Sequence, residues 1–170
     1  IRPAVDALQD LNAHREVQLI ISGGIRNGAD VAKAMALGAD AVSIGSAAMI
    51  AIGDNDPKWD EDYKKLGSKA GAYDDWHEGM DPAGISTQDP ELMKRLDPVL
   101  AGKKLCNYLK VMTLEAQTLA RACGKNDLHN LEPEDLCALT VEAAAMARVP
   151  LAGIKFKFNA FFPGINNFTA

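Results

Sequence analysis

Two dipeptides, Gly23-Gly24 and Gly45-Ser46, are the residues of this chain whose types and spacing point most directly to chemistry. Each stands between a short apolar run and a segment with a helical pattern. Glycine has no Cβ, so the backbone amides of such a turn can come within hydrogen-bond distance of phosphate oxygens. Amides at the start of a helix also face an anion with a favourable dipole. The two turns together therefore predict a phosphate-binding cradle.

A purely structural role in tight turns is the alternative for these glycines, and a single Gly-Gly dipeptide would favour it. Two such turns in succession, each leading from a strand pattern into a helix pattern, favour the phosphate site instead. The spacing does not fit the G-x-G-x-x-G fingerprint of dinucleotide-binding proteins, because no third glycine follows at the required offset. From the residues alone, the predicted chemistry is an anion site.

Short strands and the helices between them must position these turns. Apolar runs over 17–21 and 41–44 are typical of buried parallel strands, and helical patterns follow over 27–37 and from Ala47. Crossover connections would place the strands side by side, with both turns at their C-terminal ends. Phosphate sites of (β/α)8 barrels often use the loops after the last two strands, and such barrels need about 250 residues. We therefore expect an α/β fold that is the C-terminal part of a (β/α)8 TIM barrel, within a longer polypeptide.

The chain divides by composition into four parts. Residues 1–53 hold the last βα units of the expected barrel. Residues 54–97 are charged, glycine-rich and weakly periodic, so we expect an irregular covering segment there. Residues 98–153 have the pattern of a C-terminal helical region of the same domain. Residues 154–170 contain all five phenylalanines and form an atypical tail.

Helical periodicity predicts further helices over 1–11, 98–123 and 134–147. A shorter helix should begin at Asp89, because an N-cap residue followed by proline and glutamate is a helix start signal. The two long C-terminal helices are expected to pack rather than to catalyse. The helix over 134–147 would bury Leu136, Leu139, Thr140, Ala143 and Ala144.

Charge and cysteine content narrow the function classes. The 170 residues carry a net charge of -5 and no basic stripe, which argues against nucleic acid as a partner. The apolar runs are too short to span a bilayer and no signal peptide is evident, so we expect a cytoplasmic protein with no membrane partner. The three cysteines, Cys106, Cys123 and Cys137, form no C-x-x-C pair, so we expect them to be buried thiols in a reducing compartment. His77 stands among acidic residues, and we expect it to lie in a solvated loop. We therefore expect no metal site.

The combined pattern resembles the FMN-binding domain of the glutamate synthase family, in particular its shorter members akin to the large subunits of N-methylglutamate synthases. Three segments carry the resemblance: LIISGGIRNGADVAKAMALGADAVSIGSA at 19–47, PAGISTQDPELMKRLDP at 82–98 and LHNLEPEDLCALTVEAAAMARVPLAG at 128–153. The second and third are far more specific than the two turns, which many phosphate-binding barrels share.

The resemblance implies a cofactor, a reaction and partners. By it, the FMN phosphate is held by Gly23, Gly24, Ile25, Gly45 and Ser46. The reaction would be glutamate formation, or an amino-group exchange in which glutamate and methylamine give N-methylglutamate and ammonia. Small-molecule substrates (glutamate, 2-oxoglutarate, ammonia or methylamine) and other subunits of a synthase complex would be the partners. The catalytic residues would lie on strands outside this chain, so residues 1–170 alone should be inactive.

The chain departs from the family pattern at one point. Ordinary glutamate synthases have cysteines just before and within the segment that matches 81–85, where they ligate an iron–sulfur cluster. Residues 72–88 contain no cysteine here, so we expect no iron–sulfur cluster from this segment. An amino-group exchange would need no such relay. Two alternatives stay open: a non-catalytic fragment or subunit that completes a barrel, and another phosphate-binding TIM-barrel enzyme such as a nucleotide monophosphate dehydrogenase.

Overall fold

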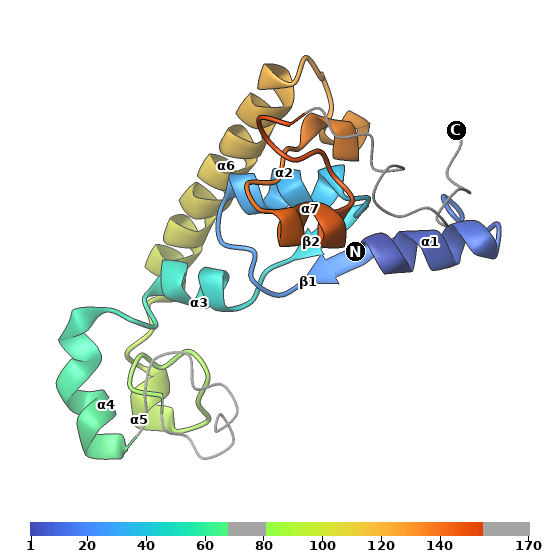
Figure 1. The fold of residues 1–170 in the computed structure, drawn as a ribbon. Coiled ribbons are helices and arrows are strands. Elements are labelled where there is room, and N and C mark those ends of the chain that lie inside the picture. Colours follow the sequence, from blue (N-terminus) through green and yellow to red (C-terminus); the bar gives the residue numbers. More distant parts are fainter. Residues whose placement is uncertain (68–80, 155–170) are drawn as a thin grey trace. The chain divides into compact units, whose positions relative to one another are not determined.

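The computed structural model describes residues 1–67 and 81–154 (Figure 1). Within these residues the chain is mixed α/β, with mostly helices and one small sheet. The elements are α1 (Arg2–Asp10), β1 (Ile20–Ser22), α2 (Gly28–Ala36), β2 (Ala41–Ser43), α3 (Ser46–Ile52), α4 (Asp60–Leu66), α5 (Pro90–Met93), α6 (Pro98–Ala122) and α7 (Val141–Ala147), with short 3-10 helices η1 (Pro57–Trp59), η3 (Leu128–Asn130) and η4 (Pro133–Asp135). None of the helices in these residues combines the length and the apolar character that crossing a membrane requires.

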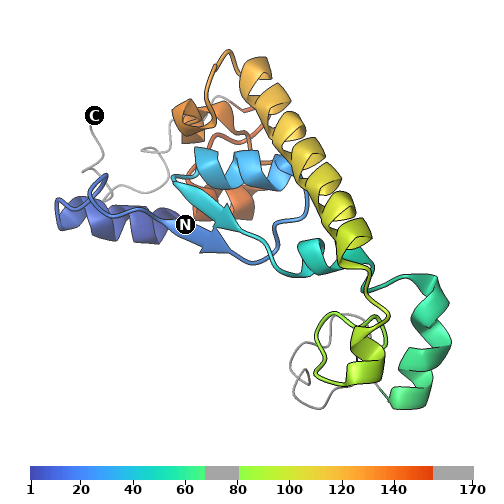
Figure 2. The same ribbon diagram turned by 180° about the vertical axis from the view of Figure 1, so that it is seen from behind.

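The small sheet consists of β1 and β2, which are hydrogen-bonded neighbours. Their arrows point the same way in Figure 2, and α2 lies between them in the sequence. Just before the strands, the Leu19 carbonyl accepts hydrogen bonds from the N–H groups of Asp40 at 2.9 Å and Ala41 at 3.4 Å. The Asp40 carboxylate in turn accepts from the Leu19 N–H at 2.7 Å. The predicted pair of adjacent parallel strands is confirmed, but the expectation that these strands are buried is wrong, because each has two exposed residues and one half-buried residue.

The chain forms two compact units, each built from segments that are distant in the sequence. The first unit contains Ile1–Ile21, Val31–Val42 and the described residues from Leu119 onward. The second contains Ser22–Asp30 and the described residues of Ser43–Thr118. Both predicted phosphate-binding turns therefore belong to the second unit.

Small apolar side chains fill the first unit. Val5 of α1 is only 2% exposed, and it packs so closely on Gly38 that a Cβ there would lie 2.8 Å from the Val5 Cγ2 atom. Gly38 has φ +105°, which is typical of a glycine that follows the end of a helix, here α2. A second cluster gathers Ala138, Ala144 and Val149 with Leu37, Leu136, Ala147 and Leu151.

Two predicted elements differ from the structure. The strand expected over 17–21 is β1, which begins only at Ile20, because the Val17 N–H donates to the Ala13 carbonyl at 3.0 Å within the preceding turn. The helix expected over 134–147 is also wrong in its first half. Residue Ala138 instead forms an extended bridge with Leu151, donating to the Pro150 carbonyl at 2.7 Å.

The buried face predicted for that helix is therefore mostly wrong. Ala144 is buried and Leu136 is half-buried, but Leu139 is 87% exposed. Thr140 and Ala143 are exposed because Thr140 caps α7, its hydroxyl accepting from the Ala143 N–H at 3.2 Å.

His129, in η3 of the first unit, gives a testable pH dependence. Its Nδ1 atom lies 3.2 Å from the Asp127 carboxylate and its Nε2 atom 3.1 Å from the Asp40 carbonyl oxygen. These hydrogen bonds, with Asp127 first, raise the pKa of His129 above its usual value of 6.5. Because this pKa is higher in the folded than in the unfolded chain, protonation of His129 stabilises the fold. The stabilisation is complete below the unfolded-state pKa and is lost as the pH rises through the folded-state pKa.

We therefore expect Asp127→Asn to lower the pKa of His129, measured by NMR titration of the imidazole. His14, which lies outside this set of hydrogen bonds, provides an internal control in the same spectra. A His129 pKa that does not change in the variant would contradict the interpretation.

Candidate functional site

The two glycine turns follow neighbouring strands directly. Gly23 and Gly24 come after β1 and have φ values of +100° and +72°, in the region that favours glycine. Gly45 precedes α3 with φ −121°. Because β1 and β2 are adjacent and point the same way, both turns begin at the same edge of the sheet. The sequence prediction that the turns share one end of the strands is confirmed.

The turns are open to a ligand. The three glycines are exposed, and a Cβ built at any of them would meet no atom within 4 Å. Within the described part of the chain, the N–H groups of Gly24, Ile25 and Gly45 donate to no backbone acceptor. The turns thus present backbone donors next to unfilled space, which is the arrangement that a bound phosphate group requires.

The backbone amides at the start of α2 are less available to an anion than the sequence suggested, because side chains already accept hydrogen bonds from them. Asn27 accepts from the Asp30 N–H at 2.9 Å, and Asp30 accepts from the Arg26 N–H at 3.2 Å. The Gly28 N–H donates to the Glu115 carboxylate at 2.7 Å. The donors that remain for an anion are therefore those of the Gly23-Gly24 turn itself and not those of the helix.

Helix α6 contacts the other end of this loop closely. The Tyr108 hydroxyl donates to the Arg26 carbonyl. Burial, and then the nearby charges of Asp30 and Glu115, raise the pKa of Tyr108, so its hydroxyl remains a donor at neutral pH. Sequence reasoning missed these contacts, since Arg26 and Tyr108 are 82 residues apart in the chain.

A polar cluster in the same unit was also missed by the sequence analysis. The Tyr63 hydroxyl lies 2.8 Å from the Asp54 carbonyl, 3.1 Å from the Asp54 carboxylate and 3.4 Å from the Asp81 carboxylate. All three side chains are buried. Burial, followed by the charges of the two carboxylates, raises the pKa of Tyr63, so it stays a protonated donor.

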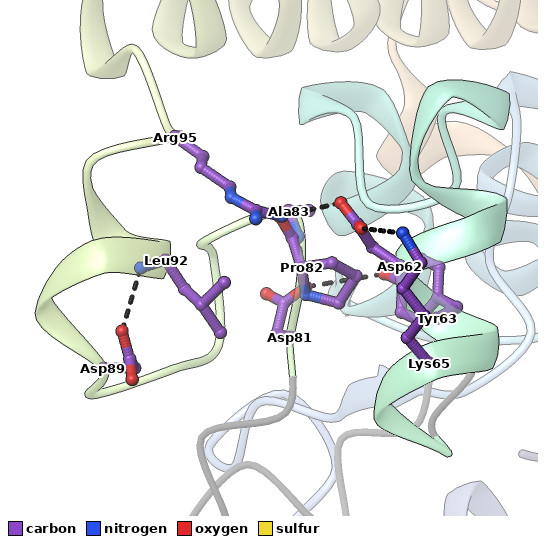
Figure 3. Close-up of polar contacts among 9 residues, drawn as sticks. All are labelled: Asp62, Tyr63, Lys65, Asp81, Pro82, Ala83, Asp89, Leu92 and Arg95. Atoms are coloured by element: carbon purple, nitrogen blue, oxygen red, sulfur yellow. Dashed lines mark hydrogen bonds and ion pairs between the residues drawn. The ribbon is translucent and has the colours of Figure 1, made fainter.

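Asp81 organises the loop that follows it (Figure 3). One carboxylate oxygen accepts from the Ala83 N–H at 2.9 Å, and the other accepts from Ile85 at 2.7 Å and Ser86 at 2.6 Å. Arg95 also holds this loop, donating to the Pro82 carbonyl at 3.1 Å. The loop is thus shaped by a carboxylate that gathers three backbone donors.

Arg95 also pairs with Asp62 at 2.9 Å, from the first turn of α4 (Figure 3). A small pocket of about 70 Å³ lies beside it and is lined by Lys58, Trp59, Arg95 and Lys104 among others. Ligand pockets usually enclose about 300–1,000 Å³, so this pocket is too small for a flavin.

The described residues also contain the side-chain types that can bind a metal ion. No group of three or more His, Cys, Asp or Glu residues suited to a metal ion occurs within residues 1–67 and 81–154. The expectation of buried thiols is wrong, because Cys106, Cys123 and Cys137 are all exposed free cysteines. Cys106 lies on a stretch of α6 where most residues are exposed. His77 lies outside the described residues.

Comparisons with known proteins point to one family. The model of a conserved region in glutamate synthase matches residues 1–56 and 72–126. A glutamate synthase large subunit-like protein of Rhizobium meliloti is 76% identical over 168 residues, which is 99% of this chain and 37% of that protein. No solved structure matches the chain.

More distant relatives carry related names. The archaeal glutamate synthase (NADPH) of Methanocaldococcus jannaschii is 41% identical over 129 residues, covering 75% of this chain and 22% of that protein. The archaeal-type glutamate synthase (NADPH) of Dehalococcoides mccartyi is 37% identical, covering 75% of this chain and 23% of that protein. The chain thus spans little more than a third of the first relative and less than a quarter of the other two. Since the family model covers most of its residues, the chain belongs to the glutamate synthase family.

Proposed function

We propose that this chain supplies the FMN-phosphate-binding end of a glutamate synthase-type flavoenzyme, as the C-terminal part of a (β/α)8 barrel. The observation that carries the proposal is the pair of open glycine turns after adjacent parallel strands. Family membership favours this proposal over a nucleotide monophosphate dehydrogenase. The pair of βα units, β1 to α2 and β2 to α3, is the arrangement that the end of such a barrel contains.

In this proposal, the phosphate is bound by residues of both turns: Gly23, Gly24, Ile25, Gly45 and Ser46. FMN supplies the redox chemistry when it is bound, and the protein binds and orients it. The open space at the turns fits a phosphate group, as do the N–H groups of Gly24, Ile25 and Gly45, which donate to no backbone acceptor among the described residues. Gly24 also has a positive φ, a backbone conformation that a residue with a side chain rarely adopts, so this turn requires glycine.

The proposed reaction is glutamate formation or amino-group exchange on glutamate, such as N-methylglutamate synthesis from glutamate and methylamine. Residues 72–88 contain no cysteine, so they offer no thiolate to an iron–sulfur cluster, and an exchange reaction does not need one there. The substrates would be glutamate, 2-oxoglutarate, and ammonia or methylamine. We place the activity in the longer parent polypeptide, in the cytoplasm and with other synthase subunits as partners.

Gly45→Val in the full-length parent protein tests the proposed site. The added side chain would stand in the space where the phosphate must approach, so we expect FMN affinity to fall at least about tenfold, or ~1.4 kcal/mol. The protein should still fold, because nothing lies within 4 Å of the new Cβ and φ is not positive. Equilibrium dialysis of the apoprotein against FMN measures the affinity, and thermal unfolding checks the fold.

Gly102→Val is the matched control for this experiment. Gly102 lies on α6, also has open space where a Cβ would stand, and is outside both turns. We expect it to bind FMN like the unmodified protein. Equal FMN affinity of the Gly45 and Gly102 variants would mean that Gly45 only forms a turn and that the proposed site is wrong.

A further inference from the structure

The loop between β1 and α2 is held at two points by a single helix, α6. We propose that Tyr108 and Glu115 of α6 are positioning residues that fix the shape of this loop and so determine how strongly the site prefers a phosphorylated flavin. The inference rests on the proposed function, in which the loop binds the FMN phosphate.

The first contact is between Glu115 and the start of α2. The Glu115 carboxylate accepts from the Gly28 N–H at 2.7 Å in a partly buried position. Gly28 has no side chain and lies directly against α6, since a Cβ there would be 2.5 Å from the Ala116 nitrogen and 2.6 Å from the Glu115 Cβ. The loop end therefore lies directly against the helix backbone, and the hydrogen bond to Glu115 holds it there.

The second contact lies two residues earlier, at Arg26. Its carbonyl accepts a hydrogen bond from the Tyr108 hydroxyl. Tyr108 and Glu115 are separated by about two helical turns, so they project from the same side of α6. One rigid helix thus fixes two backbone groups on either side of Asn27.

The two contacts with α6 affect the phosphate site through Gly23 and Gly24, which precede Arg26 and Gly28 in the loop. Gly23 and Gly24 both have positive φ, and no atom lies within 4 Å of the place where a Cβ would stand at either residue. A Gly-Gly segment has wide conformational freedom, so its amides would converge on a phosphate only if the following backbone is held. Anchoring the loop in advance reduces the entropy lost when a ligand binds.

The test compares FMN with riboflavin, which has the same ring system and no phosphate. In the full-length parent apoprotein, dissociation constants for both ligands are measured by flavin fluorescence titration. Tyr108→Phe and Glu115→Ala each remove one anchor, and we expect each to weaken FMN binding about three- to tenfold while leaving riboflavin binding within about twofold. Glu115→Gln keeps a side-chain oxygen that can accept from Gly28, so it should restore most of the FMN affinity.

Thr113→Val provides the matched control for deleting a hydroxyl from α6. Its hydroxyl donates to the Leu109 carbonyl at 2.8 Å on an exposed face of the same helix. We expect this variant to keep the FMN-to-riboflavin preference of the unmodified protein. Thermal unfolding of all variants shows whether any change in binding follows from loss of the fold.

Three outcomes would overturn the inference, and they differ from one another. An unmodified protein that binds FMN no better than riboflavin would refute the proposed phosphate site and, with it, this inference. A preference that exists but does not change in Tyr108→Phe and Glu115→Ala would refute the positioning role alone. Parallel losses of FMN and riboflavin affinity would show that α6 supports the fold in general and not the phosphate loop.

Discussion

Replacing Gly84 by alanine is expected to destabilise the loop after Asp81 by about 2–5 kcal/mol. Gly84 has φ +76°, where a residue with a side chain loses roughly 1–2 kcal/mol. The new Cβ would also clash with backbone atoms, lying 3.1 Å from the Leu92 carbonyl carbon and closer still to its oxygen. Backbone atoms of α5 cannot move aside as a flexible side chain would, and overpacking of this kind costs about 1–3 kcal/mol.

Gly67→Ala separates the two causes. Gly67 has φ +68° and no atom within 4 Å of a new Cβ, so this variant carries the conformational strain without the clash. Hydrogen exchange, measured by mass spectrometry in the full-length protein, reports the local stability around each substituted glycine: the peptide over 81–96 for Gly84 and the peptide over 60–67 for Gly67. Relative to the unmodified protein, we expect a much larger acceleration of exchange around Gly84 in Gly84→Ala than around Gly67 in Gly67→Ala. Similar accelerations at the two positions would show that the close approach of Gly84 to Leu92 does not contribute to the loss of stability.

The parts of the fold that could be predicted are those coded by neighbouring residues. Asp89 is the N-cap of α5 as expected, its side chain accepting from the N–H groups of Glu91 and Leu92. Helix α6 ends at Ala122, within one residue of the predicted bounds 98–123, and Gly124 with φ +74° follows it. Such signals depend on residues within one turn of each other, so no knowledge of the tertiary structure is needed.

The missed parts depend on contacts between distant residues. The apolar periodicity of 134–147 is real, yet the backbone of Ala138 pairs with Leu151 instead of continuing a helix. Helix propensity is a weak preference that such pairing overrides. The segment that holds Asp54 and Tyr63 likewise has no periodic pattern. Helix α4, which begins with three acidic residues, lies within the 54–97 segment that was expected to be irregular.

The candidate site also has one part that neighbouring residues encode and another that depends on contacts between distant residues. The open glycine turns are visible in the sequence because turn chemistry is local. Their anchoring by α6 is not, because Gly28 and Glu115 are 87 residues apart and meet only in the folded chain. The sequence gives no reason to connect a glycine at a helix start with a glutamate on a long amphipathic helix. The contact between Gly28 and Glu115 is visible only in the structure, where a Cβ on Gly28 would lie 2.6 Å from the Glu115 Cβ.

A second large effect is expected for Asp81→Asn, which keeps the volume of the side chain and changes its hydrogen bonding. Both carboxylate oxygens of Asp81 accept from backbone N–H groups in a buried position, Ala83 on one oxygen and Ile85 and Ser86 on the other. An amide offers one oxygen, so its NH2 group would face at least one backbone donor. A buried donor without an acceptor costs about 1–3 kcal/mol, and we expect a total loss of about 3 kcal/mol from the loop.

Asp89→Asn is the matched control, since the same substitution should have little effect there (Figure 3). Asp89 uses a single oxygen to accept from Glu91 at 2.8 Å and Leu92 at 3.0 Å, and it is exposed. Asparagine caps helices about as well as aspartate does, so the amide can replace the carboxylate at this position. Hydrogen exchange of Ala83, Ile85 and Ser86 in the full-length protein should therefore accelerate in Asp81→Asn and change little in Asp89→Asn. If these three amides exchange at the same rate in the two variants, the Asp81 carboxylate is not what holds the loop.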